Sequence, residues 1–204
     1  MNILAIAPHP DDIEFGCGGT LLEYTKKGDH IYLLVLTGGE FGGKSTIRKK
    51  EQQRSAKFIG AKKIFWGGFI DTELTDNRRL ITKIEVVIHE IKPDIVLVNY
   101  LEDIHQDHRA AAYAAISATR NIKEVLFYES PTSQHFEPDI FVEITGVIEE
   151  KLHLLELHAS QVNKTRVKNL TIVESARSCA IFRGYQGRVK FAEGFKGLRI
   201  LRKI

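Results

Sequence analysis

Short apolar runs alternate with longer amphipathic segments along the first two thirds of the chain. The apolar runs are typical of strands and cover residues 2–7, 30–36, 63–66, 94–98 and 124–128. Between them, apolar residues recur with helical spacing over 14–27, 45–60, 78–91 and 107–119. Glycine and proline at the joins mark the turns. This alternation indicates βαβ units on a parallel sheet.

The pattern weakens toward the carboxyl terminus. A further strand is predicted over 139–145 and a helix over 146–158, after which charged and aromatic residues mix without a clear period. The tail 194–204, GFKGLRILRKI, sets basic residues among apolar ones and favours a closing strand or a subunit contact over a membrane-binding role. We therefore expect an α/β fold, a Rossmann-like three-layer sandwich with a mostly parallel central sheet.

Composition narrows the class of protein. A chain of 204 residues with 43% apolar and 27% charged residues can bury one sizeable core, so we expect a single domain over 1–204. The net charge of +3 is too small to indicate a nucleic-acid partner, which leaves small molecules as the expected partners. No apolar run approaches the roughly 18 residues of a membrane span, and the amino terminus lacks a basic leader region. Two isolated cysteines, Cys17 and Cys179, suit a reducing compartment, and we expect a cytoplasmic protein.

Polar residues gather in the loops that follow the first four predicted strands. Ligands of open α/β sheets bind at the carboxyl ends of the strands, so these loops are expected to open on one edge. The four loops are 9–12 (HPDD), 37–40 (TGGE), 67–74 (GGFIDTEL) and 99–108 (NYLEDIHQDH).

Two of these loops carry residues that suit a metal ion. A catalytic zinc takes three nitrogen or oxygen ligands and leaves one position for water. His9 and Asp12, on a turn stiffened by Pro10, can supply an imidazole and a carboxylate, and His105 and His108 are both candidates for the third ligand. The two adjacent acids of HPDD have diverging side chains. If one binds the metal, the other is free to take a proton from water.

Each motif also has a plainer interpretation. The two acids of HPDD could form a turn or cap the following helix, and the histidine pair could be a solvated first turn with Asp107 facing the helix dipole. The segment GCGG at 16–19 invites comparison with a phosphate-binding loop, but it lacks the third glycine at the required spacing and favours close helix packing. The remaining histidines are expected at the surface or in the core, with His158 in HASQ as the exception.

These motifs together resemble the LmbE-like, or PIG-L, family of zinc-dependent N-deacetylases. The resemblance covers most of the chain. It rests on PHPDDIEFGCGGTL, TGGE, IRKKEQQRSAKFIG, GFIDTEL, DIHQDH, HASQ and AEGF. It implies an enzyme that removes the acetyl group from an N-acetylglucosamine-type amino sugar. It also implies a homo-oligomer, a trimer or hexamer.

The resemblance further implies a ligand set and a base. His9, Asp12 and His108 would hold Zn²⁺, with Fe²⁺ as an alternative occupant, and Asp11 would be the general base. His105, oriented by Asp107, would be the cationic group that stabilises the oxyanion and protonates the leaving amine.

Arg48 matches a family arginine at the rim of the site, where it would bind substrate. The alternative from the residues alone is a helix-surface ion pair with Glu51. Two departures concern the substrate: Ile104 and Gln106 stand beside His105 where the thiol-cofactor branch often has Arg and Pro, and Phe191 stands where the family often has tyrosine. Tyr185 lies nearby in sequence. The alternative functions are hydrolysis of another acylated amine and a non-catalytic metal- or nucleotide-binding module.

Overall fold

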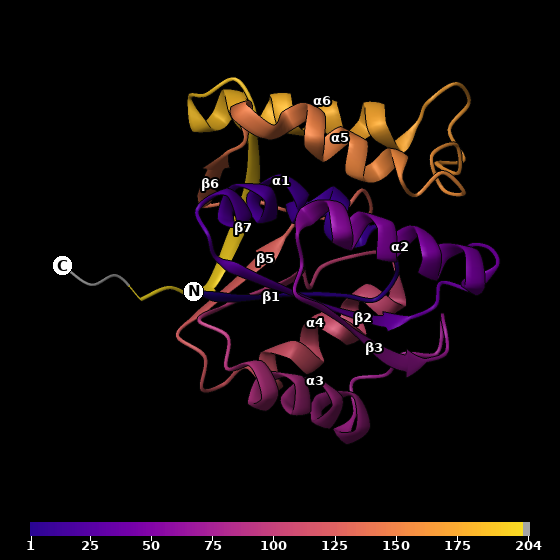
Figure 1. Ribbon diagram of the computed structural model, residues 1–204, viewed down its shortest axis with the longest axis vertical. Helices are drawn as coiled ribbons and strands as arrows, with labels where there is room; N and C mark the ends of the chain where they lie inside the picture. Colours follow the sequence, from indigo (N-terminus) through magenta and orange to yellow (C-terminus); the bar gives the residue numbers. More distant parts are fainter. Residues whose placement is uncertain (202–204) are drawn as a thin grey trace.

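The computed structural model describes residues 1–201, and a seven-stranded sheet runs through that part of the chain (Figure 1). The strand order is β3-β2-β1-β4-β5-β7-β6. The strands are β1 Asn2–Ala7, β2 His30–Thr37, β3 Lys63–Phe69, β4 Ile95–Asn99, β5 Glu124–Tyr128, β6 Ile140–Glu143 and β7 Ala192–Arg199. β1 to β5 are parallel, β7 runs antiparallel to β5, and β6 runs antiparallel to β7. The expected α/β fold with a mostly parallel sheet is confirmed.

Helices cover both faces of the sheet. α3 and α4 lie on one face, α1 and α2 lie on the other, and α5 and α6 lie beyond α1 (Figure 1). The bounds are α1 Asp12–Lys26, α2 Ser45–Ile59, α3 Arg78–Ile91, α4 Gln106–Ala118, α5 Ile148–Glu156 and α6 Ile172–Gly187, with a 3₁₀ turn η1 at Thr145–Val147. β1 alternates between two apolar cores, with Ile3 and Ala5 on the α1 side and Leu4 and Ile6 on the α3 side. Such a strand reads as a continuous apolar run because both of its faces are buried.

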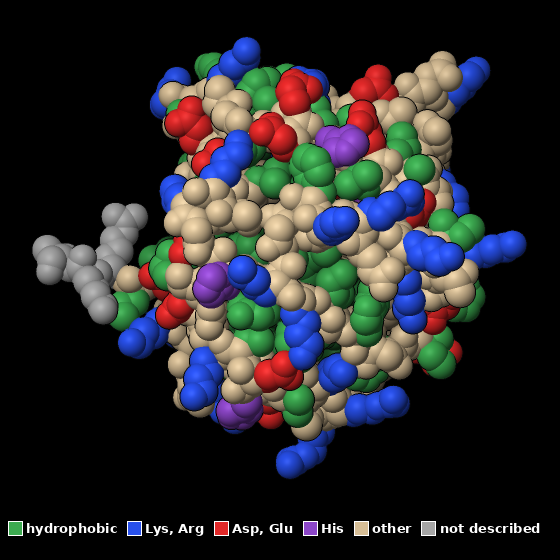
Figure 2. All heavy atoms as spheres, viewed as in Figure 1, with side chains coloured by type: hydrophobic (Ala, Val, Ile, Leu, Met, Phe, Trp, Pro, Cys, Tyr) green, Lys and Arg blue, Asp and Glu red, His purple; other side chains and the backbone are tan. Residues whose placement is uncertain are grey.

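The surface matches the small net charge. Figure 2 shows lysine and arginine side chains spread over one face with acidic side chains among them. Within residues 1–201, no helix combines the length and the apolarity that crossing a lipid bilayer requires.

α6 is the element that the sequence pattern missed. Its inward side carries small residues such as Ala176 and Ala180, while Ile181, Phe182 and Tyr185 are exposed on the outward side. A helix with apolar residues on both sides has no amphipathic stripe to detect. The available signal was the capping box at 171–174, where the Thr171 and Glu174 side chains cap the first turn reciprocally. The predicted closing strand exists as β7, and residues 202–204 of the tail lie outside the described residues.

Close packing explains the glycines of GCGG, as expected. A Cβ at Gly16 would lie 2.0 Å from the Tyr128 ring, and one at Gly19 would lie 2.8 Å from Ile144. α1 therefore approaches the sheet and the η1 turn more closely than a helix with side chains at these positions can.

The strand order places the loops that follow β1 and β4 side by side. β1 pairs with β2 on one side and with β4 on the other. The chain goes to α1 after β1 and to α4 after β4, which lie on opposite faces of the sheet. A crevice opens at such a reversal point, beyond the carboxyl ends of the strands.

Candidate metal centre

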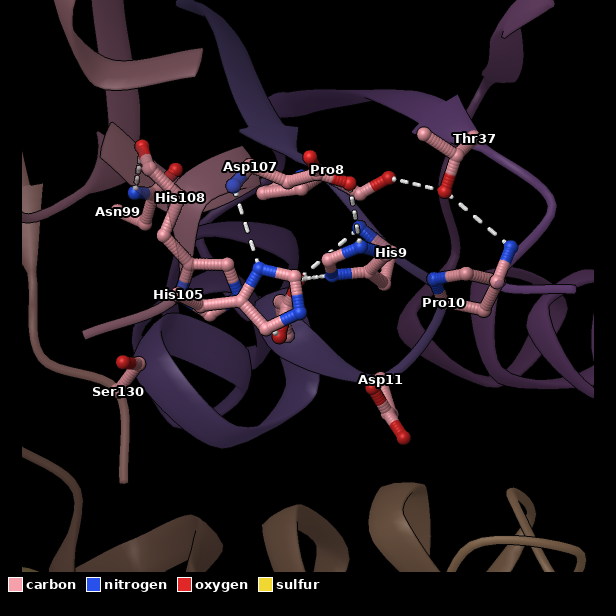
Figure 3. A network of polar contacts seen from close by, with 12 residues as sticks. Pro8, His9, Pro10, Asp11, Thr37, Asn99, His105, Asp107, His108 and Ser130 are labelled. Atoms are coloured by element: carbon pink, nitrogen blue, oxygen red, sulfur yellow. Dashed lines mark hydrogen bonds and ion pairs between the residues drawn. The ribbon is translucent and has the colours of Figure 1, made fainter. Parts of the chain in front are cut away.

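Two imidazoles and a carboxylate converge in this crevice. One possible ligand atom each from His9, Asp12 and His108 lies within 4.8 Å of the others. Nδ1 of His9 is 3.3 Å from Oδ2 of Asp12, and Nε2 of His108 is 3.4 Å from Oδ1 of Asp12. Figure 3 shows the rings of His9, His105 and His108 gathered together, with Asp11 to one side.

Local structure fixes the three residues. The His9 loop is tied to β2 because the backbone and hydroxyl of Thr37 both donate to the carbonyl of Pro8 at 2.9 Å. Asp12 begins α1, and its Oδ2 accepts the backbone N–H of His9 at 3.0 Å. His108 lies in the first turn of α4, where the Asn99 side chain donates to its carbonyl at 2.7 Å.

Outer carboxylates determine which nitrogen of each imidazole faces inward. Nδ1 of His108 donates to Asp103 at 3.0 Å, which leaves Nε2 facing Asp12. Nε2 of His9 lies 2.9 Å from Asp71 and 3.1 Å from Asp107, which leaves Nδ1 facing Asp12. Metal-binding histidines characteristically donate their other N–H to a carboxylate in this way. The donor set therefore fits a divalent cation.

The same contacts shift the pKa values of the histidines. Burial alone lowers the pKa of His108, but Asp12 and Asp103 outweigh it and raise the pKa to about 9. Burial likewise lowers the pKa of His9, and hydrogen bonds with Asp107, Asp12 and Asp71 raise it well above the ordinary value. Without a metal ion, both rings are therefore doubly protonated near neutral pH. The second proton lies on the nitrogen that faces Asp12, where a cation would bind.

Asp11 adopts a backbone conformation that is uncommon for residues other than glycine. Its φ of 95° lies in the left-handed region. The side chain of Gln52 accepts its N–H at 3.3 Å, and Arg48 donates to its Oδ1 at 3.3 Å. Burial raises the pKa of Asp11 to about 6 although Arg48 lowers it. A carboxyl group with this pKa can exchange a proton near neutral pH.

The contacts and the pKa of His105 differ from those that the resemblance implies. The Asp107 carboxylate does not orient it, because its oxygens accept from Thr72 N–H at 2.7 Å and Leu74 N–H at 3.3 Å and contact His9. Instead, Nδ1 of His105 caps α4 by accepting the Asp107 backbone N–H at 3.2 Å. Burial and the neighbouring His9 and His108 lower the pKa of His105. A lowered pKa favours the neutral ring, and because Nδ1 accepts the Asp107 N–H, the proton of a neutral ring lies on Nε2.

Arg48 is neither at the rim nor paired with Glu51. Its guanidinium is buried and donates to the carbonyls of Gly39 at 2.8 Å and Pro10 at 2.6 Å. Glu51 accepts instead from the backbone and hydroxyl of Ser160. Arg48 extends along the inner side of α2 because the glycine loop after β2 leaves space there: a Cβ at Gly39 would lie 2.0 Å from it. It joins the loops after β1 and β2.

Several residues of the centre had no role assigned from the sequence. Asp71 and Asp103 lie in the GGFIDTEL and NYLEDIHQDH loops, so an acid at the carboxyl end of a strand was the available signal. His158 is buried beside the Glu14 carboxylate at 3.5 Å, and Gln52 donates to Glu14 at 2.6 Å. Gln52 also contacts the backbone of Asp11, so this cluster joins α1 to α2 next to the candidate centre.

Two aromatic residues lie away from the centre. Phe191 is buried in the core on the α1 side of the sheet, and Tyr185 is 72% exposed on α6, where Arg188 lies over its ring. No contact among the described residues brings either of them to the three candidate ligands.

Comparisons with known proteins agree with this geometry. The sequence profile of the PIG-L family, described as GlcNAc-PI de-N-acetylase, matches residues 4–119, which include all three candidate ligands. The chain is 33% identical to the diacetylchitobiose deacetylase of Thermococcus kodakarensis, over 96% of this chain and 82% of the relative. It is 30% identical to a probable N-acetyl-alpha-D-glucosaminyl L-malate deacetylase 2 of Bacillus cereus, over 78% of this chain and 83% of the relative.

A solved structure also matches closely. The N,N'-diacetylchitobiose deacetylase of Pyrococcus horikoshii, in complex with its inhibitor MPG, superposes with a TM-score of 0.86 at 27% identity. The match covers 97% of this chain and 83% of that protein.

Proposed function

Because this chain belongs to the PIG-L family, we propose that it is a metal-dependent deacetylase that releases acetate from an N-acetylglucosamine-type amino sugar. The observation that carries the proposal is the orientation of His9 and His108. Each ring has one nitrogen on an outer carboxylate and the other facing Asp12. This arrangement supports a ligand set of His9, Asp12 and His108.

Zinc is the proposed resident ion, with Fe²⁺ as the alternative. Two imidazoles and one carboxylate are a common catalytic zinc set and leave a position open for water or substrate. When bound, the ion supplies Lewis acidity, which polarises a carbonyl group and makes water more acidic.

Asp11 is the proposed general base. Its side chain is 23% exposed beside the candidate ligands, so a water molecule can reach it. The carboxylate accepts the proton from the attacking water, and the resulting acid can return it to the nitrogen of the departing amine. Arg48 and Gln52 hold this side chain and its backbone and are proposed positioning residues.

His105 is the proposed donor to the developing oxyanion. Because Nδ1 is occupied by the α4 backbone, the N–H on Nε2 is free to donate. A neutral imidazole at a helix amino terminus can stabilise an oxyanion by this hydrogen bond. Asp107 supports this arrangement indirectly, through His9 and through the backbone of the loop after β3.

The substrate proposal comes from relatives. The diacetylchitobiose and N-acetylglucosaminyl malate deacetylases both carry acetylated glucosamine units in their names, so a small N-acetylglucosamine conjugate is the proposed substrate. The single-domain organisation, the homo-oligomeric state and the cytoplasmic location stay predictions from the sequence.

The test measures metal binding first and the release of acetate and amine second. Purified protein is treated with chelator, reloaded with Zn²⁺ or Fe²⁺, and incubated with N-acetylglucosamine, diacetylchitobiose and an N-acetylglucosaminyl conjugate. We expect stoichiometric metal and the release of equal amounts of acetate and free amine. Failure to bind any divalent ion would overturn both the deacetylase and the related amide hydrolase.

Two other outcomes identify the alternatives. Metal binding with amine release only from a differently acylated amine would indicate another amide hydrolase. Metal binding without release from any acylated substrate would indicate a non-catalytic binding module.

A further inference from the structure

A buried ion pair contacts the backbone of α1 beside the candidate metal centre. Lys151 of α5 and Glu193 of β7 pair with side chains that are 2% and 4% exposed. The Lys151 ammonium also donates to the carbonyls of Glu14 at 3.2 Å and Phe15 at 2.5 Å. All three of its N–H donors are therefore used.

The carboxylate of the pair contacts the next turn of the same helix. Oε1 of Glu193 accepts the backbone N–H of Gly19 at 2.9 Å, and Oε2 accepts that of Thr20 at 2.7 Å. In a regular α-helix the N–H of Gly19 pairs with the carbonyl of Phe15. The ion pair thus engages both partners of this step in the helical ladder. Its two charged groups come from different elements.

Stability alone does not account for such a pair. Burying two charges costs free energy that their attraction only partly returns, and apolar replacements of similar volume are often as stable. What the pair provides is a directional tie of α1 to α5 and to β7 at one defined position.

That tie lies within one helical turn of the candidate centre. Asp12 is the first residue of α1, and the carbonyls that Lys151 contacts lie two and three residues further on. Glycines at 16, 18 and 19 bring this part of α1 close to its neighbours but supply no side chains that could hold its position along or about the helix axis. The polar tie therefore limits how α1 can slide or rotate, and Asp12 moves with the helix.

We propose that Lys151 and Glu193 are positioning residues that set the placement of Asp12 through the first two turns of α1. This inference rests on the proposed metal site. It gives a role to the glutamate of AEGF, which no contact among the described residues brings to the candidate ligands.

The experiment measures Zn²⁺ binding and the geometry of the bound ion. Glu193→Asp keeps the charge but withdraws the carboxylate by one methylene, and the double variant Lys151→Met/Glu193→Gln removes both charges without leaving one buried alone. Zn²⁺ affinity is measured by competition with a chromophoric chelator, well below the thermal midpoint of each variant. The absorption spectrum of Co²⁺-loaded protein reports the ligand geometry.

We expect Zn²⁺ affinity to fall about 10-fold or more in Glu193→Asp, as for other residues that orient a ligand, and the Co²⁺ spectrum to change. The matched control is Lys26→Met, which removes an exposed ion pair with Glu150 across the same two helices, 3.3 Å apart. That variant should match the wild type in both measurements.

Folded Glu193→Asp protein with unchanged affinity and an unchanged spectrum would overturn the inference, whatever the double variant does. If the double variant folds, it should show the same losses, and wild-type affinity in it would contradict the inference as well. A wild-type protein that binds neither Zn²⁺ nor Fe²⁺ would instead refute the proposed function.

Discussion

The Nδ1–H of His108 donates to Oδ2 of Asp103 at 3.0 Å, while the other ring nitrogen faces Asp12. The same Asp103 oxygen accepts the hydroxyl of Ser130 at 2.5 Å. Asp103 therefore fixes both the tautomer and the orientation of a proposed ligand.

Replacing Asp103 by asparagine should weaken metal binding. The amide can present its NH₂ group to His108 and can no longer stabilise the ring by charge. We expect a 10- to 100-fold loss of Zn²⁺ affinity, about the usual effect for such partners, measured by chelator competition. Glu102→Gln, at the exposed neighbouring position, is the control and should leave affinity unchanged.

Two variants should distinguish the proposed base, Asp11, from a proposed metal ligand, His108. Asp11→Asn keeps a side chain that tolerates the left-handed backbone, so it should retain metal and lose about 100- to 10,000-fold in turnover. His108→Ala should lose more Zn²⁺ affinity than the 10- to 100-fold typical of an outer partner. Metal analysis and acetate release are measured on the same preparations. Equal metal loss in both variants would contradict the assignment.

Stability of the metal-free chain should depend on pH through His108. Its folded pKa of about 9 lies above the ordinary value of 6.5, so the protonated ring contributes stability that is fully present below pH 6.5. That contribution is lost as the pH rises through about 9. Urea unfolding of chelator-treated protein should show this decline. His108→Gln protein should show a smaller one, and equal slopes would refute the attribution.

Arg48 should act on the pH profile of the reaction. Burial raises the pKa of Asp11, and the Arg48 guanidinium opposes this shift. Removing the cation in Arg48→Met therefore raises the pKa further, so the ionised base is lost at a higher pH. We expect the acid limb of kcat/KM to move upward by about one pH unit. Lys50→Met, on the exposed side of the same helix, should leave the limb in place.

The positive φ of Asp11 should make the free energy of unfolding depend on which residue replaces it. Glycine adopts a positive φ without strain, whereas alanine does not, and both remove the contact with Arg48. We therefore expect Asp11→Gly to be more stable than Asp11→Ala by about 1 kcal/mol in chemical denaturation. Equal stability would mean that the backbone relaxes to a negative φ when the side chain is lost.

The fold was predictable where burial imposes a regular pattern. The continuous apolar runs of β1, β2 and β4 identify strands buried on both faces, and the parallel topology then places the HPDD and HQDH loops at the same edge. α6 escaped prediction because Phe182 and Tyr185 face solvent opposite a buried face of small residues.

The inner site was more predictable than its surroundings. Residue type and spacing indicate His9 and Asp12 and leave His105 and His108 both open as the third ligand. The partners of Asp71, Asp103 and Arg48 depend on loops that meet only in the folded chain. His105 shows the same limit. A histidine before a helix can bind metal, carry charge or cap the helix, and only the position of the α4 backbone decides among them.

The left-handed backbone at Asp11 has a consequence for protein engineering. In a library of this protein selected only for survival of heating, glycine would be better tolerated at position 11 than other residues that lack a carboxylate, since it accepts the positive φ without strain. Variants with glycine at this position would survive heating but lack the proposed general base and therefore most of the activity. Selection for robustness at this position therefore needs a simultaneous screen for acetate production.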